Sequence, residues 1–291
     1  MKQQLKQLVG PEWQARAHRL SRLRWITKYR LMRSFGGRIG LRRQLGYVLL
    51  DPETESFSFE LDDERQVISA LAQALGRSED ELAGYAAETR TDPELNEALA
   101  RHVRWRFDVK RRMPLGYRLP WYIFVRALKP ALVVETGIYH GLGSLVLLRA
   151  LARNAQAGSP GELMSFDTDQ RAGSVVRDEV RRDWRRFAGS THDLLLPALH
   201  GRHVDMLFQD TPHTEENQRF EFGAALAHAA PRLLLVDGSG GYAKTLAAIC
   251  RERDVPYHRV PLRSRAHVYS DAAIAFALVE VPDTGCRGAR T

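Results

Sequence analysis

The chain has 291 residues, of which 44% are hydrophobic, and a formal net charge of +8 at pH 7. This length suits one α/β domain with an additional module, and the composition is that of a globular protein with a sizeable core. No apolar run approaches the ~20 residues that cross a bilayer, which argues against a spanning helix. The basic N-terminus lacks the continuous apolar segment of a signal peptide, so we expect a cytoplasmic protein. Cys250 and Cys286 lie far apart, with no histidine at metal-ligand spacing.

The positive charge is concentrated at the start of the chain. Residues 1–50 contain 12 Lys and Arg and one acidic residue, a net charge of +11, which leaves −3 for residues 51–291. Apolar residues form a rough helical stripe between the arginines, which predicts a basic helical arm. Its role has two interpretations. It is a solvated face packed on the body or on a second copy of the chain, or it contacts an anionic partner such as nucleic acid.

Residues 51–119 are predicted to form a helical cap or lid module. A period-two alternation over residues 56–61 indicates a short extended segment at its start. Helical periodicity begins at Asp62, Ser78 has the position of an N-cap for a second helix, and Pro93 has that of the first residue of a third.

Residues 120–291 alternate short apolar runs with helical patterns. This predicts an α/β fold with a doubly wound, mostly parallel, seven-stranded sheet of the Rossmann-like type. Because no helix fits between the last two strands, the final strand is expected to run antiparallel. The strands are expected near 132–135, 163–167, 186–189, 204–209, 232–237, 257–261 and 272–280, and the helices near 121–128, 144–153, 171–183, 192–199, 215–229 and 241–253.

The first of these strands leads into a glycine-rich turn. After the apolar run come Glu135 and then Gly137, Gly141 and Gly143, followed by a helical pattern. Strand, glycine turn and helix open a nucleotide-type βαβ unit. The spacing G-x-x-x-G-x-G differs from the G-x-G-x-x-G of dinucleotide sites, and a carboxylate at Glu135 would repel a pyrophosphate. A ligand with an ammonium or sulfonium charge suits this position, and S-adenosylmethionine is such a ligand.

Residues after the second and third strands are candidates for the nucleoside end of this ligand. In open α/β sheets, ligands bind beyond the carboxyl ends of the strands. Asp167 lies there and can accept hydrogen bonds from ribose hydroxyls, with Asp169 as the second choice. Ser190 and Thr191 follow the third strand and are expected to face an adenine ring.

Residues after the fourth and fifth strands carry the candidate chemistry. Asp210 ends the fourth strand, His213 lies three residues beyond it, and Asp237 ends the fifth. Two aspartates on neighbouring strand ends can share a hard divalent cation. A histidine beside them can take a proton near neutral pH.

These motifs occur in the order and spacing of a known family. The run Val133–Gly141 resembles the first motif of class I S-adenosylmethionine-dependent methyltransferases. Asp205–Asn217 and Leu233–Asp237 resemble segments of the O-methyltransferase branch that includes macrocin-type sugar O-methyltransferases. The resemblance covers residues 120–280. It implies that S-adenosylmethionine is the cofactor and that a methyl group is transferred to a hydroxyl of a sugar or another small molecule.

The resemblance also implies roles for individual residues. His213, supported by Asp210, is the expected base, and Asp210 and Asp237 are the expected Mg²⁺ ligands. The sequence departs from the family where Pro212 and Gly238 replace further metal ligands and where a serine replaces the usual acid near the adenine. The residues expected to bind the cofactor are Glu135, Gly137, Tyr139, Gly141, Gly143, Ser144, Asp167, Ser190, Thr191 and Asp210.

Two other functions stay open at this point. An RNA or protein methyltransferase would hold its partner with residues 1–50, and its activity would fall steeply with salt. A non-catalytic module of the same fold would have lost its metal site through Pro212 and Gly238, and would bind no S-adenosylmethionine.

Overall fold

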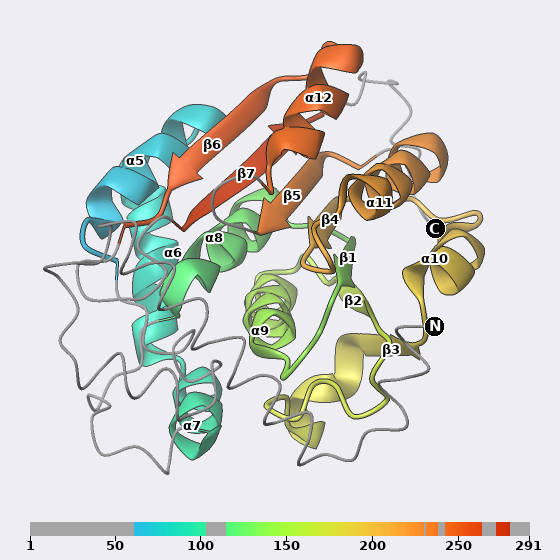
Figure 1. Ribbon diagram of the computed structural model, residues 1–291. Coiled ribbons are helices and arrows are strands. Elements are labelled where there is room, and N and C mark those ends of the chain that lie inside the picture. The colour runs from blue at the N-terminus through green and yellow to red at the C-terminus, as the bar shows by residue number, and fades with distance from the viewer. Residues whose placement is uncertain (1–60, 103–114, 230, 238–241, 264–271, 280–291) are drawn as a thin grey trace, which may run out of the picture.

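The computed structural model describes residues 61–102, 115–229, 231–237, 242–263 and 272–279 (Figure 1). The predicted basic arm of residues 1–50 lies outside these ranges, as do all but the last residue of the extended segment 56–61 and the position of Gly238. The division into arm, cap module and methyltransferase domain therefore stays a prediction. Within the described ranges, no helix has both the length and the apolar character needed to cross a membrane.

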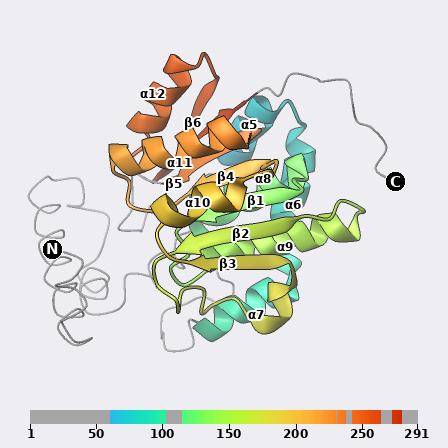
Figure 2. The ribbon, with the colours of Figure 1, turned by 90° about the vertical axis from the view of Figure 1, so that its right-hand side faces the viewer.

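A seven-stranded sheet with the order β3-β2-β1-β4-β5-β7-β6 forms the centre of the molecule (Figure 2). The first five strands pair in parallel, whereas β7 runs antiparallel to both β5 and β6. This confirms the predicted sheet with its antiparallel last strand. The strands are β1 (Leu132–Thr136), β2 (Glu162–Asp167), β3 (Trp184–Ala188), β4 (Met206–Gln209), β5 (Leu233–Asp237), β6 (Tyr257–Pro261) and β7 (Ala273–Leu278).

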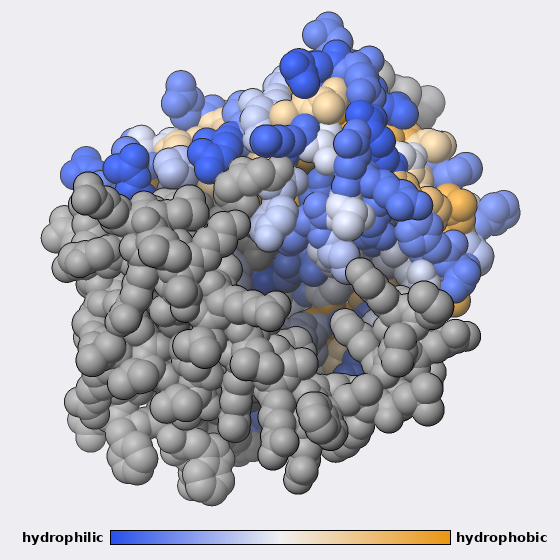
Figure 3. Space-filling model, in the orientation of Figure 1, coloured by the Kyte–Doolittle hydropathy of each residue, from blue (hydrophilic) through white to orange (hydrophobic). Residues whose placement is uncertain are grey.

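Helices cover both faces of the sheet (Figure 1). One face carries α8 (Leu119–Leu128) and α9 (Leu142–Gln156), with α6 (Glu79–Thr91) and α7 (Pro93–His102) as outer helices packed on them. On the same face, α5 (Glu64–Leu75) packs against α6 and β6. The other face carries α10 (Thr191–Leu199), α11 (Glu215–His228) and α12 (Lys244–Glu252). The surface over α10, α11 and α12 is largely hydrophilic, which fits helices whose apolar side faces the sheet (Figure 3).

Side chains of the central strands alternate between two hydrophobic clusters, as the two-residue period of a strand requires. Val133 and Phe208 point to the side of α8 and α9, where the Phe208 ring lies 4.8 Å from that of Trp121. Val134 and Leu207 point to the side of α10 and α11. Because both faces are covered, these strands read as continuous apolar runs in the sequence.

The predicted helix over residues 171–183 is wrong. This segment is mostly a loop, with one short 3-10 helix, η2 (Asp178–Asp183). Its backbone N–H groups serve the turn after β1: Gly173 donates to the carbonyl of Tyr139 at 2.8 Å, and Val175 donates to that of His140 at 2.9 Å. Gly173 also has a φ of +89°. The backbone donors that would build a helix are thus committed to tertiary contacts.

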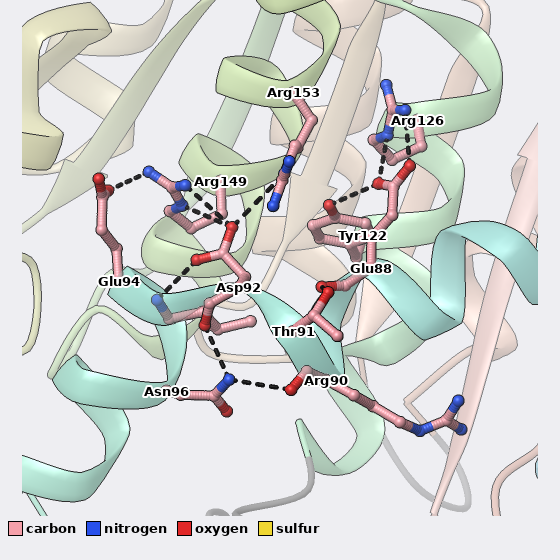
Figure 4. Close-up of polar contacts among 11 residues, drawn as sticks. Glu88, Arg90, Thr91, Asp92, Glu94, Asn96, Tyr122, Arg126, Arg149 and Arg153 are labelled. Atoms are coloured by element: carbon pink, nitrogen blue, oxygen red, sulfur yellow. Dashed lines mark hydrogen bonds and ion pairs between the residues drawn. The ribbon is translucent and has the colours of Figure 1, made fainter.

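A network of ion pairs joins the outer helices to α8 and α9 (Figure 4). The Asp92 side chain is fully buried and accepts from Arg149 through Nη2 at 2.9 Å and Nε at 3.1 Å. It also accepts from the backbone N–H of Leu95 at 2.8 Å, in the first turn of α7. Close by, Glu88 accepts from Arg126 at 2.7 and 2.8 Å. Because these charges are mostly buried and mutually paired, they fix how the outer helices sit on the sheet domain.

Candidate active site

The glycine turn after β1 brings three strand ends together. Gly137 has a φ of +89° and Gly141 one of +91°, a region that glycine adopts readily. The N–H of Gly137 donates to the Phe166 carbonyl at 2.8 Å, and that of Asp210 donates to the Thr136 carbonyl at 2.8 Å. A Cβ on Gly137 would lie 2.6 Å from the carbonyl carbon of Asp210. The ends of β1, β2 and β4 meet because this position has no side chain.

Glu135 lies under the turn, at the N-terminal end of α9. Its side chain is 1% exposed. Its Oε2 accepts hydrogen bonds from Ser144 Oγ at 2.5 Å and Ser165 Oγ at 2.7 Å. Burial raises the pKa of Glu135 to about 7, although both serines and the charge of Arg118 oppose the shift. The carboxyl group is thus poised to lose its proton when a positive charge arrives.

Asp167 lies at the neighbouring strand end and holds the same turn. Its Oδ2 accepts from the backbone N–H groups of Ile138 and Tyr139, both at 2.9 Å, and its Oδ1 accepts from that of Asp169 at 2.8 Å. Glu135 pairs in register with Ser165, two residues before Asp167. The two predicted carboxylates therefore lie on the same edge of the sheet, as a shared ligand requires.

The remaining predicted cofactor residues flank this edge. The N–H of Gly189 donates to the Asp167 carbonyl at 2.8 Å, which brings the end of β3 next to that of β2. Ser190 is the N-cap of α10 and accepts from the N–H of His192 at 3.2 Å, and Thr191 is buried. Tyr139 is 60% exposed at the tip of the turn, with a φ of +52°.

His213 has a tautomer set by its neighbours. Its Nδ1 lies 3.1 Å from Gln209 Oε1, an oxygen that can only accept. Gln218 Nε2 also lies 3.5 Å from Nδ1, but it donates to Gln209 Oε1 at the shorter 3.1 Å. With Nδ1 protonated toward Gln209, Nε2 keeps its lone pair, 3.9 Å from Asp210 Oδ1. Burial lowers the pKa of His213, and the charge of Arg118 adds to that effect while Asp210 opposes it. At neutral pH this side chain is a neutral imidazole with Nε2 ready to take a proton.

A buried chain of hydrogen bonds determines which atom of the Gln209 amide, the oxygen or the nitrogen, faces His213. Thr211 Oγ1 donates to the buried carboxylate of Glu221 at 2.9 Å and accepts from Gln209 Nε2 at 2.8 Å. Thr136 donates to the same carboxylate at 2.9 Å. Since the carboxylate fixes the direction of the chain, Gln209 Oε1 must face His213.

Arg118 brings a positive charge to the end of β4. Its Nη2 donates to Asp210 Oδ2 at 2.5 Å, and its side chain is 9% exposed. The guanidinium lies over the ring of Trp121 at 4.0 Å and that of Tyr117 at 4.6 Å. The Asp210 carboxylate thus has the guanidinium at one oxygen and the His213 imidazole near the other.

The described residues do not fit a divalent cation at this position. No group of three or more His, Cys, Asp or Glu in the described ranges has an arrangement that would hold a metal ion. Pro212 has no oxygen in its side chain, and the carboxylate of Asp210 already pairs with a guanidinium. Asp237, the other predicted ligand, ends β5, and its side chain lies outside the described part of the chain.

The same edge fits S-adenosylmethionine by charge. Carboxyl groups surround the glycine turn at Glu135, Asp167 and Asp210. One of them stands at the N-terminus of α9, where a pyrophosphate would bind in a dinucleotide site. The oxygens of Asp167 have lone pairs left for ribose hydroxyls beyond the backbone donors that they accept. This arrangement favours a cationic nucleoside and disfavours an anionic one.

Comparison with known proteins agrees with this geometry. Residues 134–244, from β1 to the start of α12, match the family model described as a methyltransferase domain. This match bears out the predicted methyltransferase. No curated protein sequence matches the chain significantly.

Several solved methyltransferase structures are similar to part of the chain. Cofactor-bound Rv0187 from MTB has 20% identity and a TM-score of 0.46, with 65% of this chain and 90% of that one covered. The O-methyltransferase TomG from Streptomyces achromogenes, in complex with SAM, has 19% identity and a TM-score of 0.47, with 65% and 91% covered. The O-methyltransferase from Bacillus cereus in complex with SAH has 17% identity and a TM-score of 0.47, with 64% and 91% covered. At these values the similarities do not identify an acceptor.

Sequence reasoning missed several polar residues of the site. Arg118 ends a short 3-10 helix, η1 (Gly116–Arg118), 92 positions before Asp210, so no local pattern connects the two. Gln209 did carry a signal, because it is a polar residue at the end of an otherwise apolar strand. Gln218 and Glu221 are fully buried polar residues on the inner face of α11, where a helical pattern predicts apolar ones.

Proposed function

We propose that the chain transfers a methyl group from S-adenosylmethionine to a hydroxyl oxygen of a small molecule. The observation that carries this proposal is the neutral His213 imidazole, whose basic Nε2 is directed by Gln209 toward the end of β4. A hydroxyl is a poor nucleophile, and a base within reach makes it a usable one. A sugar is the first acceptor to test, because the sequence resembles macrocin-type sugar O-methyltransferases.

When bound, S-adenosylmethionine supplies an electrophilic methyl carbon on a positively charged sulfur. The protein holds the methyl donor and the acceptor hydroxyl in line, which is its main contribution to the rate of a direct displacement. The carboxyl groups of Glu135 and Asp167 would hold the ammonium group and the ribose on either side of the glycine turn. His213 Nε2 would take the proton of the acceptor hydroxyl, so that the hydroxyl oxygen could receive the methyl group.

The test separates cofactor binding from turnover. Calorimetry with S-adenosylhomocysteine first establishes binding, and methyl transfer from labelled S-adenosylmethionine is then measured against a panel of sugars and phenols. His213→Ala should leave the affinity for S-adenosylhomocysteine within about twofold, while turnover falls by ~10²-fold or more. His203→Ala is the matched control, since His203 also stands beside an aspartate, Asp205 at 3.7 Å, but is 55% exposed and lies away from this edge.

Two results would contradict the proposal. An unchanged rate in His213→Ala would remove this histidine from the mechanism. Transfer to RNA or protein, with none to small hydroxyl compounds, would show that the acceptor class is wrong. It would favour the alternative in which residues 1–50 hold a macromolecular partner.

A further inference from the structure

We propose that the guanidinium of Arg118 takes the place of a divalent cation at Asp210, so that methyl transfer at this site needs no metal. The inference rests on the proposed function, since it concerns the charge beside the same acceptor oxygen. It departs from what the sequence resemblance implies, namely a Mg²⁺ ion held by Asp210 and Asp237.

The first argument is the position of the guanidinium. Its Nη2 donates to Asp210 Oδ2 at 2.5 Å and so pairs with the carboxylate that the predicted metal site would use. The charge is held in place from two sides, because the guanidinium carbon lies 4.0 Å from the Trp121 ring centroid and 4.6 Å from that of Tyr117. Arginine stacks on aromatic rings and pairs with carboxylates in this way, and it stays protonated at every physiological pH.

The second argument is the chemistry of the possible ligands. Mg²⁺ requires six oxygen ligands in near-octahedral geometry, several of them commonly from water, with at least one or two carboxylates. Of the two predicted ligands, Asp210 is the one whose side chain lies in the described part of the chain, and its two oxygens face Arg118 at 2.5 Å and His213 at 3.9 Å. Proline and glycine at positions 212 and 238 contribute no side-chain oxygen. A second positive ion at Asp210 would also meet the repulsion of a guanidinium that is 9% exposed and little screened by water.

The third argument is what the fixed charge does for the reaction. As the acceptor hydroxyl gives its proton to His213, negative charge grows on its oxygen. The Arg118 charge, separated from His213 by the Asp210 carboxylate, makes the potential at that oxygen more positive, which is the electrostatic part of what a metal would supply. Arg118 also holds the Asp210 carboxylate toward His213. We therefore treat Arg118 as a positioning residue that acts through Asp210.

Manganese binding tests the inference without an identified acceptor. Mn²⁺ is titrated into the full chain with bound S-adenosylhomocysteine, and free Mn²⁺ is followed by electron paramagnetic resonance. The wild type should bind no Mn²⁺ below about 1 mM, and excess Mg²⁺ or a chelator should leave its affinity for S-adenosylhomocysteine unchanged. Arg118→Gln frees the carboxylate and should bind Mn²⁺ at least tenfold more tightly, and Asp210→Asn introduced into that variant should abolish the gain. Arg118→Lys, which keeps the positive charge, should behave like the wild type.

A second variant guards against a folding defect. Arg118→Met keeps an apolar stem on the two aromatic rings and removes the charge together with its N–H donors, so it should show the same gain as Arg118→Gln. Tight Mn²⁺ binding to the wild type that is lost in Asp210→Asn would overturn the inference. So would Arg118→Gln and Arg118→Met variants that fold and bind Mn²⁺ no better than the wild type. Failure of the wild type to bind S-adenosylhomocysteine is a separate result, which counts against the proposed function.

Discussion

Gly137 packs directly on the backbone of Asp210, so closely that a Cβ on the glycine would lie 2.6 Å from the Asp210 carbonyl carbon. The two residues belong to the ends of β1 and β4, and the cofactor turn and the proposed base are thereby locked to each other. The role of this glycine is to let two strand ends meet, and its positive φ lets the chain turn at the same point.

Gly137→Ala should therefore destabilise the protein by about 3 kcal/mol or more, because it adds a steric overlap with backbone to the cost of the left-handed conformation. Gly158→Ala is the matched control. Gly158 has a similar φ of +82° but no atom within 4 Å of its Cβ position, so its cost should be only about 1–2 kcal/mol. Urea unfolding of the three proteins measures the difference. Equal costs would show that the contact with Asp210 carries no energy.

Glu135 gives the apoprotein a characteristic dependence on pH. Its pKa is about 7 in the folded protein and near 4.5 in the unfolded chain, so between these values the folded state holds a proton that the unfolded state has lost. Stability is full below about pH 4.5 and declines as the pH rises to about 7, by about 3 kcal/mol in all. Glu135→Gln removes this pH-dependent contribution to the free energy of unfolding. Its free energy of unfolding should exceed that of the wild type at pH 8 and approach it at pH 5.

Much of the fold could be predicted because the strands are buried on both faces. Each strand of the sheet is a short apolar run, and the predicted ranges agree with the observed ones to within a few residues. The failure at residues 171–183 has a local cause. The sequence there has helical periodicity, but Gly173 and Val175 donate their N–H groups to the turn after β1, and no pattern within the segment reveals that.

The candidate site also contains residues that the sequence could predict and one that it could not. Glu135, Asp167 and Asp210 could be placed from the sequence because topology alone brings the strand ends to one edge. Arg118 could not, since its contact with Asp210 depends on how the segment before α8 packs against the sheet. Tertiary pairs of this kind have no period and no fixed spacing.

The Gln209–His213 contact should hold His213 in one tautomer, and substitution of Gln209 should release it. Two-bond ¹H–¹⁵N spectra of the imidazole should show His213 protonated at Nδ1 in the wild type. Gln209→Leu removes the acceptor and should lower kcat by roughly tenfold, a part of the ~10²-fold that general base catalysis supplies, with little change in the affinity for S-adenosylhomocysteine. In the wild type the acid limb of kcat should lie below pH 6.5, because burial lowers the pKa of His213 and the base must be unprotonated.

Gln209→Glu provides the opposing variant. A carboxylate accepts the Nδ1–H more strongly than an amide does and stabilises the imidazolium, so the acid limb should move to higher pH. A His213 protonated at Nε2 in the wild type, or an acid limb that is the same in all three proteins, would contradict the role given to Gln209.

The Asp92–Arg149 pair should be among the most costly side-chain contacts to break outside the site. The Asp92 side chain is fully buried and that of Arg149 is 10% exposed, so Asp92→Ala leaves a buried guanidinium with only the half-exposed carboxylate of Glu94 as a partner. It also removes the acceptor for the first turn of α7. We expect a loss of about 3–5 kcal/mol. Arg90→Ala, which breaks the exposed pair with Glu64, is the control and should cost less than about 1 kcal/mol. Thermal and urea unfolding measure both losses. An Asp92→Ala variant as stable as Arg90→Ala would show that apolar packing alone holds the outer helices against α8 and α9.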